Sequence, residues 1–195
     1  MARRFYDLIN FNAQKPVLKA LNKRLEDTPK AMRKGARRAI NRTLTTARKE
    51  TSKAIRDDLA LRAGDIKDRI EKKVVFDLEG KLVVRDRRLE LIKFRTPRQT
   101  KRTRRRGAAR GGVKVTIYKR KGRQLIPGAF IAKGRKSGRE HVLKREGKER
   151  YPVKILYGPS ITKTANRHLP EILKRTEPVF AKNLDREIKF ALSKL

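Results

Sequence analysis

A stretch of 49 residues without a single Asp or Glu constrains this 195-residue chain more than any other feature. Between Leu91 and Arg139 the stretch carries 18 Lys or Arg residues, half of the formal net charge of +36. Like charges at this density repel one another in a folded protein. We therefore expect a polyanion to lie nearby in the working protein. Nucleic acid is one candidate, and an acidic protein surface is the other.

Composition sets further limits on the class of protein. A chain of this length favours one domain over two, and 37% hydrophobic residues allow a modest core. The absence of Cys excludes disulfides and thiolate metal sites. No apolar run approaches the roughly 18 residues of a membrane span, and the first residues do not resemble a signal peptide. We expect a soluble protein with no membrane contact that acts where it is made.

Apolar residues recur at helical spacing in the first third of the chain, so residues 1–71 are predicted to be the helical part of the molecule. Phe5, Leu8 and Ile9 begin this pattern. A long helix is predicted from about residue 29 to 60, because Thr28 can cap its free amides and Pro29 fits its first turn.

Strand patterns dominate residues 72–158. They recur at residues 74–76, 82–84, 89–91, 113–117, 125–132, 142–143 and 153–155. The basic segment has no periodicity, so residues 95–112 are predicted to be a long exposed loop. Residues 159–195 return to helical spacing, with Pro170 at a helix start and Pro178 expected to kink or split the helix. The order predicts a single α+β domain over residues 1–195 with a mostly antiparallel sheet.

Catalytic chemistry is poorly represented in the sequence. His141 and His168 are the only His residues, and both are interpreted as surface residues. Two acidic clusters, Asp57-Asp58 and Asp65/Asp68/Glu71, lie among Lys and Arg, which favours surface ion pairs over acid–base catalysis. No metal-ligand spacing, nucleophile motif or phosphate-binding loop is present. The sequence therefore argues against an enzyme and predicts no catalytic residue, cofactor or metal.

The basic segment has a functional and a structural interpretation. In the first, its cations contact DNA phosphates or an acidic partner, as proposed for Arg95, Arg98, Lys101, Arg102, Arg104, Arg105, Arg106 and Arg110. In the second, it is a solvated, mobile loop that serves solubility or docking on an acidic protein. No aromatic residue lies between Phe94 and Tyr118, so base stacking has little support.

The predicted long helix also has a candidate interface. At 1.5 Å per residue it would be roughly 45 Å long, which exceeds the core that this chain can build. Its apolar stripe consists mostly of small residues, which favours close helix contact over deep burial. We therefore expect a subunit interface that includes Met32, Ala36, Ala39, Ile40, Ala47 and Ala54.

Four segments taken together resemble the minor tail protein Z family of long-tailed bacteriophages and prophages. They are Ala39-Ile-Asn-Arg-Thr-Leu-Thr-Thr-Ala-Arg48 with its continuation to Ile70, Leu89-Glu-Leu-Ile-Lys-Phe94, Leu125-Ile-Pro-Gly-Ala-Phe-Ile-Ala132 and Tyr151-Pro-Val-Lys-Ile-Leu-Tyr-Gly-Pro-Ser160. Their order and spacing agree with that family over about residues 30 to 165. The basic insertion between Arg95 and Arg110 is heavier than the resemblance leads one to expect.

The resemblance implies a structural virion protein that completes the head-proximal, neck end of a tail, so that the tail joins the head and delivers DNA. It implies assembly in the host cytoplasm and a ring, six-fold to match the tail. The neighbours it implies are tail terminator, tail tube, tape measure or head connector proteins, with DNA in the lumen. Pro127 and Gly128 are expected to turn the chain, Phe130 to point into the core, and Gly158 and Pro159 to end the last strand.

Composition alone favours a different class, a ribosomal or nucleoid protein that binds nucleic acid as its main task. Co-purification separates the two classes, because a ribosomal protein travels with RNA and a tail protein travels with virions. The sequence leaves this alternative open.

Overall fold

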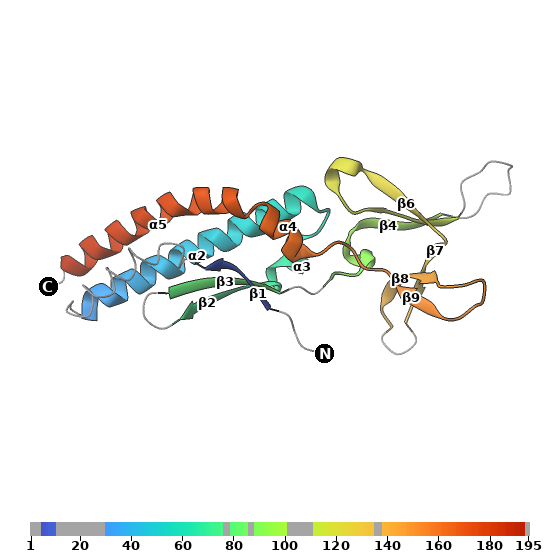
Figure 1. Cartoon of the computed structure of the whole chain (residues 1–195), viewed down its shortest axis with the longest axis horizontal. Coiled ribbons are helices and arrows are strands. Elements are labelled where there is room, and N and C mark those ends of the chain that lie inside the picture. Colours follow the sequence, from blue (N-terminus) through green and yellow to red (C-terminus); the bar gives the residue numbers. More distant parts are fainter. Residues whose placement is uncertain are drawn as a thin grey trace. The chain divides into compact units, whose positions relative to one another are not determined.

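The computed structural model describes residues 5–10, 30–75, 79–85, 88–100, 111–134 and 138–193 (Figure 1). The chain forms two compact units. The helix unit comprises Met1–Ala54, Asp68–Asp86 and Thr162–Leu195, and the sheet unit comprises Ile55–Lys67 and Arg87–Ile161. Helices and antiparallel sheets confirm the α+β class. One domain over residues 1–195 stays a prediction. Over the described ranges, no helix is long and apolar enough to cross a membrane.

Helices and one three-stranded sheet build the helix unit. Its elements are β1 (Phe5–Asn10), most of α2 (Lys30–Asp58), β2 (Ile70–Val75), β3 (Glu79–Arg85), nearly all of α4 (Ile161–Arg167) and α5 (Leu169–Leu192). The sheet is antiparallel in the order β1-β3-β2. The helix predicted from 29 to 60 is confirmed as α2. Its expected capping residues Thr28 and Pro29 lie outside the described residues.

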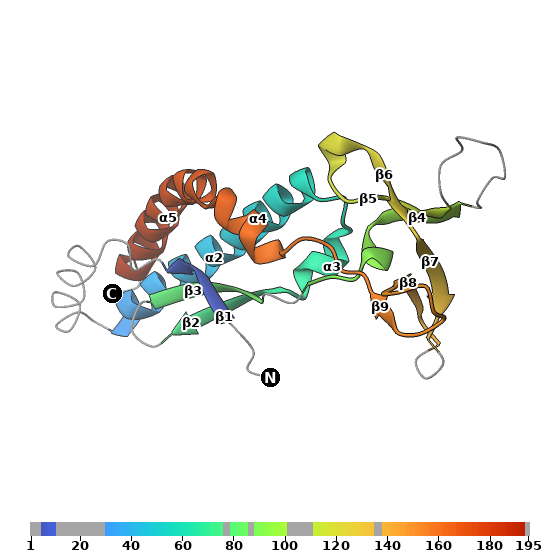
Figure 2. The same ribbon diagram turned by 45° about the vertical axis from the view of Figure 1, so that its right-hand side comes forward.

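Helix α2 lies between α5 and the sheet, so two of its flanks are covered (Figures 1 and 2). On one flank, Ile40 and Leu44 lie over Gly80 of β3. On the other, the Asn183 amide of α5 donates to the Thr43 hydroxyl, which itself donates to the Ala39 carbonyl. Gly35 lies on the same flank, where a β-carbon would come within 3.0 Å of the Glu187 carbonyl oxygen of α5. Small residues at such positions let the two helices approach closely.

The N-terminal residues correct one prediction, because Phe5–Asn10 form strand β1 and not a helix. The strand pairs with β3 along a register that is interrupted between Asp7 and Ile9. A short apolar run is compatible with both helix and strand, and the choice depends on the available partner. Here β3 offers an edge, and the backbone hydrogen bonds of the ladder stabilise the extended form.

Helix α5 confirms the start predicted at Pro170, which lies in its first turn. The helix continues through Pro178 without being split. Proline removes one amide donor from the helix interior. Burial of Ile172, Thr176 and Ala191 along one face provides the packing that holds the helix together across this position.

The sheet unit is built from two separate three-stranded antiparallel sheets, β4-β5-β6 and β7-β8-β9. Its elements are α3 (Ala63–Lys67), the 3-10 helix η2 (Leu91–Lys93), β4 (Arg95–Thr100), β5 (Gly112–Thr116), the 3-10 helix η3 (Lys119–Lys121), β6 (Arg123–Pro127), β7 (Ala129–Lys133), β8 (Glu140–Arg145) and β9 (Val153–Ile155). The strands predicted near 113–117, 125–132, 142–143 and 153–155 are confirmed.

Two predictions in this unit are wrong. Residues 89–91 are not a strand, since Leu91–Lys93 form a 3-10 helix. The predicted loop begins with strand β4 at Arg95–Thr100, which pairs with β5. Strand β4 has no apolar alternation, so its own residues do not indicate a strand. It is extended because β5, with Val113 and Val115 buried, offers its edge for backbone pairing.

The second and fourth of the segments that resemble the tail protein family, residues 89–94 and 151–160, meet in the core of the sheet unit. The Leu91 amide donates to the Leu156 carbonyl at 2.9 Å, and the Gly158 amide donates to the Leu89 carbonyl at 2.8 Å. The ring of Phe94, which is 2% exposed, lies so close to Gly158 that a β-carbon there would overlap it. Strand β9 ends at Ile155, before Gly158, so Gly158 provides close packing against Phe94 and does not itself end the last strand as expected.

The third of these segments, residues 125–132, turns at Gly128 as expected. Gly128 has a φ of 74°, a conformation open to glycine, and its amide donates to the Gly111 carbonyl. The next residue, Ala129, is buried. Phe130 does not enter the core, which corrects the prediction. It is half-buried, and its ring lies 5.6 Å from the guanidinium carbon of Arg145.

Candidate functional site

One face of the β4-β5-β6 sheet carries exposed cations. Residues directly opposite in an antiparallel pair share a face. Arg98 lies opposite Lys114, and Arg95 and Arg123 both lie opposite Thr116. Lys114 and Thr116 are two residues apart on β5, so all of these side chains share one face. We call the four exposed cations the cationic sheet face: Arg95, Arg98, Lys114 and Arg123.

The stretch that carries the cationic sheet face contains no Asp or Glu between Leu91 and Arg139, so no acidic residue close in sequence offsets its positive charge. Arg98 and Lys114 stand directly across from each other, an arrangement of like charges that destabilises a sheet. Arg123 donates through Nη2 to the Thr96 hydroxyl at 3.1 Å, which orients its guanidinium without neutralising it. The surface is therefore electrostatically suited to an external anion.

A hollow of about 880 Å³ adjoins this face through Arg95. Cationic side chains from three stretches of the chain, residues 56–65, 92–97 and 119, line it, and its walls also include apolar residues. The cations are Arg56, Arg62, Lys93, Arg95 and Lys119, and the apolar residues are Ala60, Leu61, Ala63, Ile92, Phe94 and Pro97. Among the described residues of the lining, Asp65 is the one acid, and it pairs with Lys93 at 3.6 Å. The balance of the lining is strongly positive.

Backbone hydrogen bonds hold the walls of this hollow together. The Arg95 amide donates to the Ala60 carbonyl, and the Ala60 amide donates to the Ile117 carbonyl, each at 2.9 Å. Leu59 forms a further bridge to Tyr118. These bonds place the segment that carries Arg62 beside β4, which is distant in sequence.

The predicted contact residues fall into two groups. Arg95 and Arg98 belong to the cationic sheet face. Six others lie outside the described residues: Lys101, Arg102, Arg104, Arg105, Arg106 and Arg110. Sequence reasoning did not assign Lys114 and Arg123 to a site, although the absence of acids around them was a usable signal. Arg56 and Arg62 had no such signal, since only tertiary contacts bring them to the hollow.

The residues predicted at a subunit interface lie on α2. Ala36, Ala39, Ile40 and Ala47 are buried within the helix unit, with exposed fractions of 7% or less. Such side chains offer no surface to a neighbouring subunit in this fold. Met32 and Ala54 keep intermediate exposure. An interface that includes α2 stays a prediction, and in this structure its contacts are restricted to the exposed positions of the helix.

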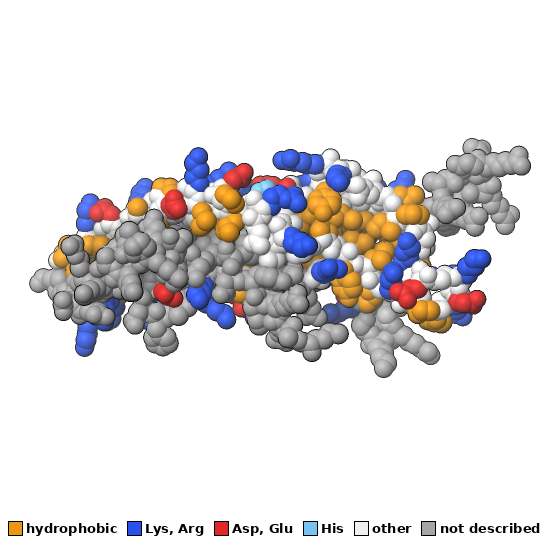
Figure 3. Space-filling model, viewed as in Figure 1, with side chains coloured by type: hydrophobic (Ala, Val, Ile, Leu, Met, Phe, Trp, Pro, Cys, Tyr) orange, Lys and Arg blue, Asp and Glu red, His pale blue; other side chains and the backbone are white. Residues whose placement is uncertain are grey.

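Polar side chains elsewhere are held in local pairs. His141, predicted at the surface, has intermediate exposure, and its Nδ1 lies 2.6 Å from Glu90 Oε2. The predicted ion pairs of Asp65 and Glu71 are confirmed with Lys93 and Arg85. Across the described part of the chain, no group of three His, Asp or Glu side chains is placed to hold a metal ion. Figure 3 shows Lys and Arg spread widely over the visible face, with fewer Asp and Glu among them.

Comparison with known proteins gives one match. The family model of prophage minor tail protein Z matches residues 17–195. No curated protein and no solved structure shows significant similarity to the chain. The family match extends the resemblance of the four segments to nearly the whole chain, including both units. The chain therefore belongs to the prophage minor tail protein Z family, and it is a structural protein of a phage tail.

Proposed function

We propose that this tail protein completes the head-proximal end of the tail, where it joins the tail to the head and admits the DNA. The family match over residues 17–195 carries the proposal. It favours a virion protein over the ribosomal or nucleoid alternative, which rests on composition alone. The neck is also the place where tail subunits meet the end of the packaged genome, so an unneutralised cationic surface has a natural partner there.

The protein works as a ring, with six copies to match the symmetry of the tail. Its neighbours are drawn from the tail terminator, tail tube, tape measure and head connector proteins. Each copy contributes one cationic sheet face, so a ring presents a repeated positive surface. A repeated surface suits DNA, because phosphate contacts need no base sequence.

The cationic sheet face contacts DNA phosphates. Its four cations are exposed, share one face and lack an acidic partner in their own stretch. Neutralising phosphates releases counterions, so binding is strong at low salt and independent of sequence. An acidic neighbouring protein is the competing partner for the same face.

Loss of the gene tests the place in the tail. In a lysate without this protein, we expect tails of normal length and filled heads that remain separate under the electron microscope. Addition of purified protein should restore joined particles. Tails of abnormal length, or joined particles that carry DNA and infect normally, would contradict the proposed position at the neck.

A double substitution tests the DNA contact. Arg98→Gln with Lys114→Gln should lower the logarithmic salt slope of duplex binding by up to about 0.9 for each phosphate that the variant no longer neutralises. Lys49→Gln with Lys53→Gln removes the same charge from an exposed part of α2 and serves as the matched control. Equal slopes for both variants would show that the face binds DNA only through net charge. An unchanged slope together with failed assembly would assign the face to an acidic protein neighbour.

A further inference from the structure

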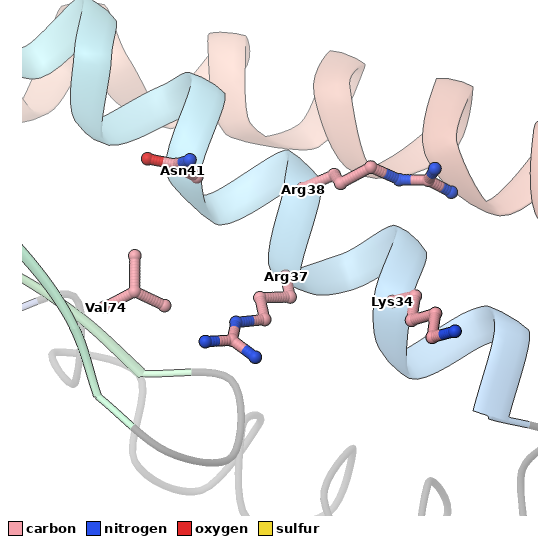
Figure 4. A pocket seen from close by; sticks show the side chains of 5 residues that line it. All are labelled: Lys34, Arg37, Arg38, Asn41 and Val74. Atoms are coloured by element: carbon pink, nitrogen blue, oxygen red, sulfur yellow. The ribbon is translucent and has the colours of Figure 1, made fainter.

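A second cationic hollow lies in the helix unit, away from the acid-free stretch. Its volume is about 380 Å³, and it lies between α2 and β2. The described residues that line it are Lys34, Arg37, Arg38, Asn41 and Val74. Figure 4 shows Lys34 and Arg37 on one side of α2, with Val74 pointing from β2 toward the helix.

The charges around this hollow are one-sided. Residues 30–49 of α2 contain eight Lys or Arg and no Asp or Glu. The first turn of the helix has no acidic residue, so its cations add to the positive end of the helix dipole. Lys72, on β2, donates through Nζ to the Thr45 hydroxyl at 2.9 Å and brings a further positive charge to the same flank.

The opposite flank of the same helix is neutralised internally. There, Glu187 of α5 pairs with Arg42 Nη1 at 2.6 Å and with Nε of Arg38 at 3.0 Å, so Arg38, although it also lines the hollow, is already neutralised. No described acidic residue pairs in this way with Lys34 or Arg37. The fold thus supplies a carboxylate on one flank of α2 and leaves a hollow on the other.

The shape and lining of the hollow favour a protein carboxylate over nucleic acid. A DNA duplex is a convex rod whose phosphates contact protruding cations. Its charged backbone gains nothing from contact with an apolar wall. The hollow has the size of a few side chains, and Val74 with the aliphatic stems of Lys34 and Arg37 gives it an apolar lining. A protein segment in which Glu or Asp alternates with apolar residues can pair with the cations of the hollow and also contact its apolar lining.

We infer that this hollow is a docking site for an acidic, partly apolar segment of a protein partner, whose carboxylates pair with Lys34 and Arg37. The inference adds a second, chemically different surface to the cationic sheet face. It does not rest on the position of the protein at the neck, because the proposed binding can be measured with the isolated 195-residue protein.

The test uses the 195-residue protein and a fluorescent peptide in which Glu alternates with Leu. Lys34→Gln with Arg37→Gln should weaken binding of this peptide by about tenfold, as two exposed ion pairs predict. The control Lys49→Gln with Lys53→Gln has the same net charge and lies on the same helix, and it should change binding by less than about twofold. A peptide with Gln in place of Glu should not bind either protein.

A second variant places the acid within the hollow itself. Val74→Glu leaves both cations in position but offers them an internal carboxylate, so it should also weaken peptide binding. Equal losses of peptide affinity in Lys34→Gln with Arg37→Gln and in the control would overturn the inference. Unchanged peptide binding by Val74→Glu would also overturn it. If Lys34→Gln with Arg37→Gln lowers the affinity for a short DNA duplex but not for the peptide, the inference is overturned in favour of nucleic acid. None of these results depends on whether tails and heads join.

Discussion

Two positively charged regions of this protein differ in how their charge is balanced. On the α5 flank of α2, Arg38 and Arg42 share the buried carboxylate of Glu187, which is 4% exposed. On the cationic sheet face, Arg98 and Lys114 stand opposite each other with no acid nearby in sequence. The first arrangement joins two helices. The second costs stability within the chain and offers charge to a partner.

The comparison predicts which substitutions should affect the stability of the fold and which should affect the binding of partners. Substitutions on the packed flank of α2 should lower the free energy of unfolding and act on function only through folding. Substitutions on the cationic sheet face should leave folding intact and act on partners. Three substitutions at packed positions, one of them in the sheet unit, and one double substitution on the cationic sheet face test this separation, beginning with the largest expected effect.

Ala47→Glu should have the largest effect on folding. Ala47 is fully buried, so the substitution places a carboxylate among apolar neighbours without a partner. We expect the free energy of unfolding to fall by about 3 kcal/mol or more in urea titrations. Lys49→Glu, two residues away and exposed, is the control, and a similar loss in both would refute the assigned packing.

Gly158→Ala should be the next most damaging change. The added β-carbon would overlap the buried ring of Phe94, which has little room to move. Overpacking of this kind costs about 1–3 kcal/mol of unfolding free energy. Phe94→Leu made together with Gly158→Ala should recover part of the loss, which a double-mutant cycle measures. Strictly additive effects would show that the two residues do not compete for space.

Glu187→Gln should cost less, about 1–2 kcal/mol of unfolding free energy. The substitution removes the charge that Arg38 and Arg42 share, but both arginines are about half exposed and regain water. Thermal unfolding of the variant at low and high salt measures the effect. If the ion pairs matter, added salt should narrow the gap to the unsubstituted protein. A gap that is independent of salt would point to impaired packing.

Arg98→Gln with Lys114→Gln should have the smallest effect on folding, within about 0.5 kcal/mol and in the stabilising direction. The reason is that the substitution removes repulsion between two like charges on facing strands. Urea titration of the same variant used for DNA binding checks this. A clear loss of stability would mean that the face is structural, and the distinction between the two regions would fail.

Local patterns in the sequence account for much of the fold. The 3.6-residue spacing predicted α2 and α5, and period-two patterns predicted most strands after residue 70. Errors arose where the partner decides the conformation. Residues 5–10 have an apolar run that fits both helix and strand, and Arg95–Thr100 have no strand pattern at all. In both cases the edge of a neighbouring strand determines the outcome.

By itself, the sequence determined the charge, the α+β class and the family, because these depend on composition, periodicity and ordered motifs. Only the tertiary structure decided which cations belong together. Arg62 and Arg95 are brought to one hollow by backbone bonds through Ala60. It also decided that Ala36, Ala39 and Ala47 of α2 are buried within the chain, since a stripe of alanines is equally suited to packing within a chain and between chains. Spacing along the sequence records a periodicity, whereas burial and charge balance depend on which segments the folded chain places side by side.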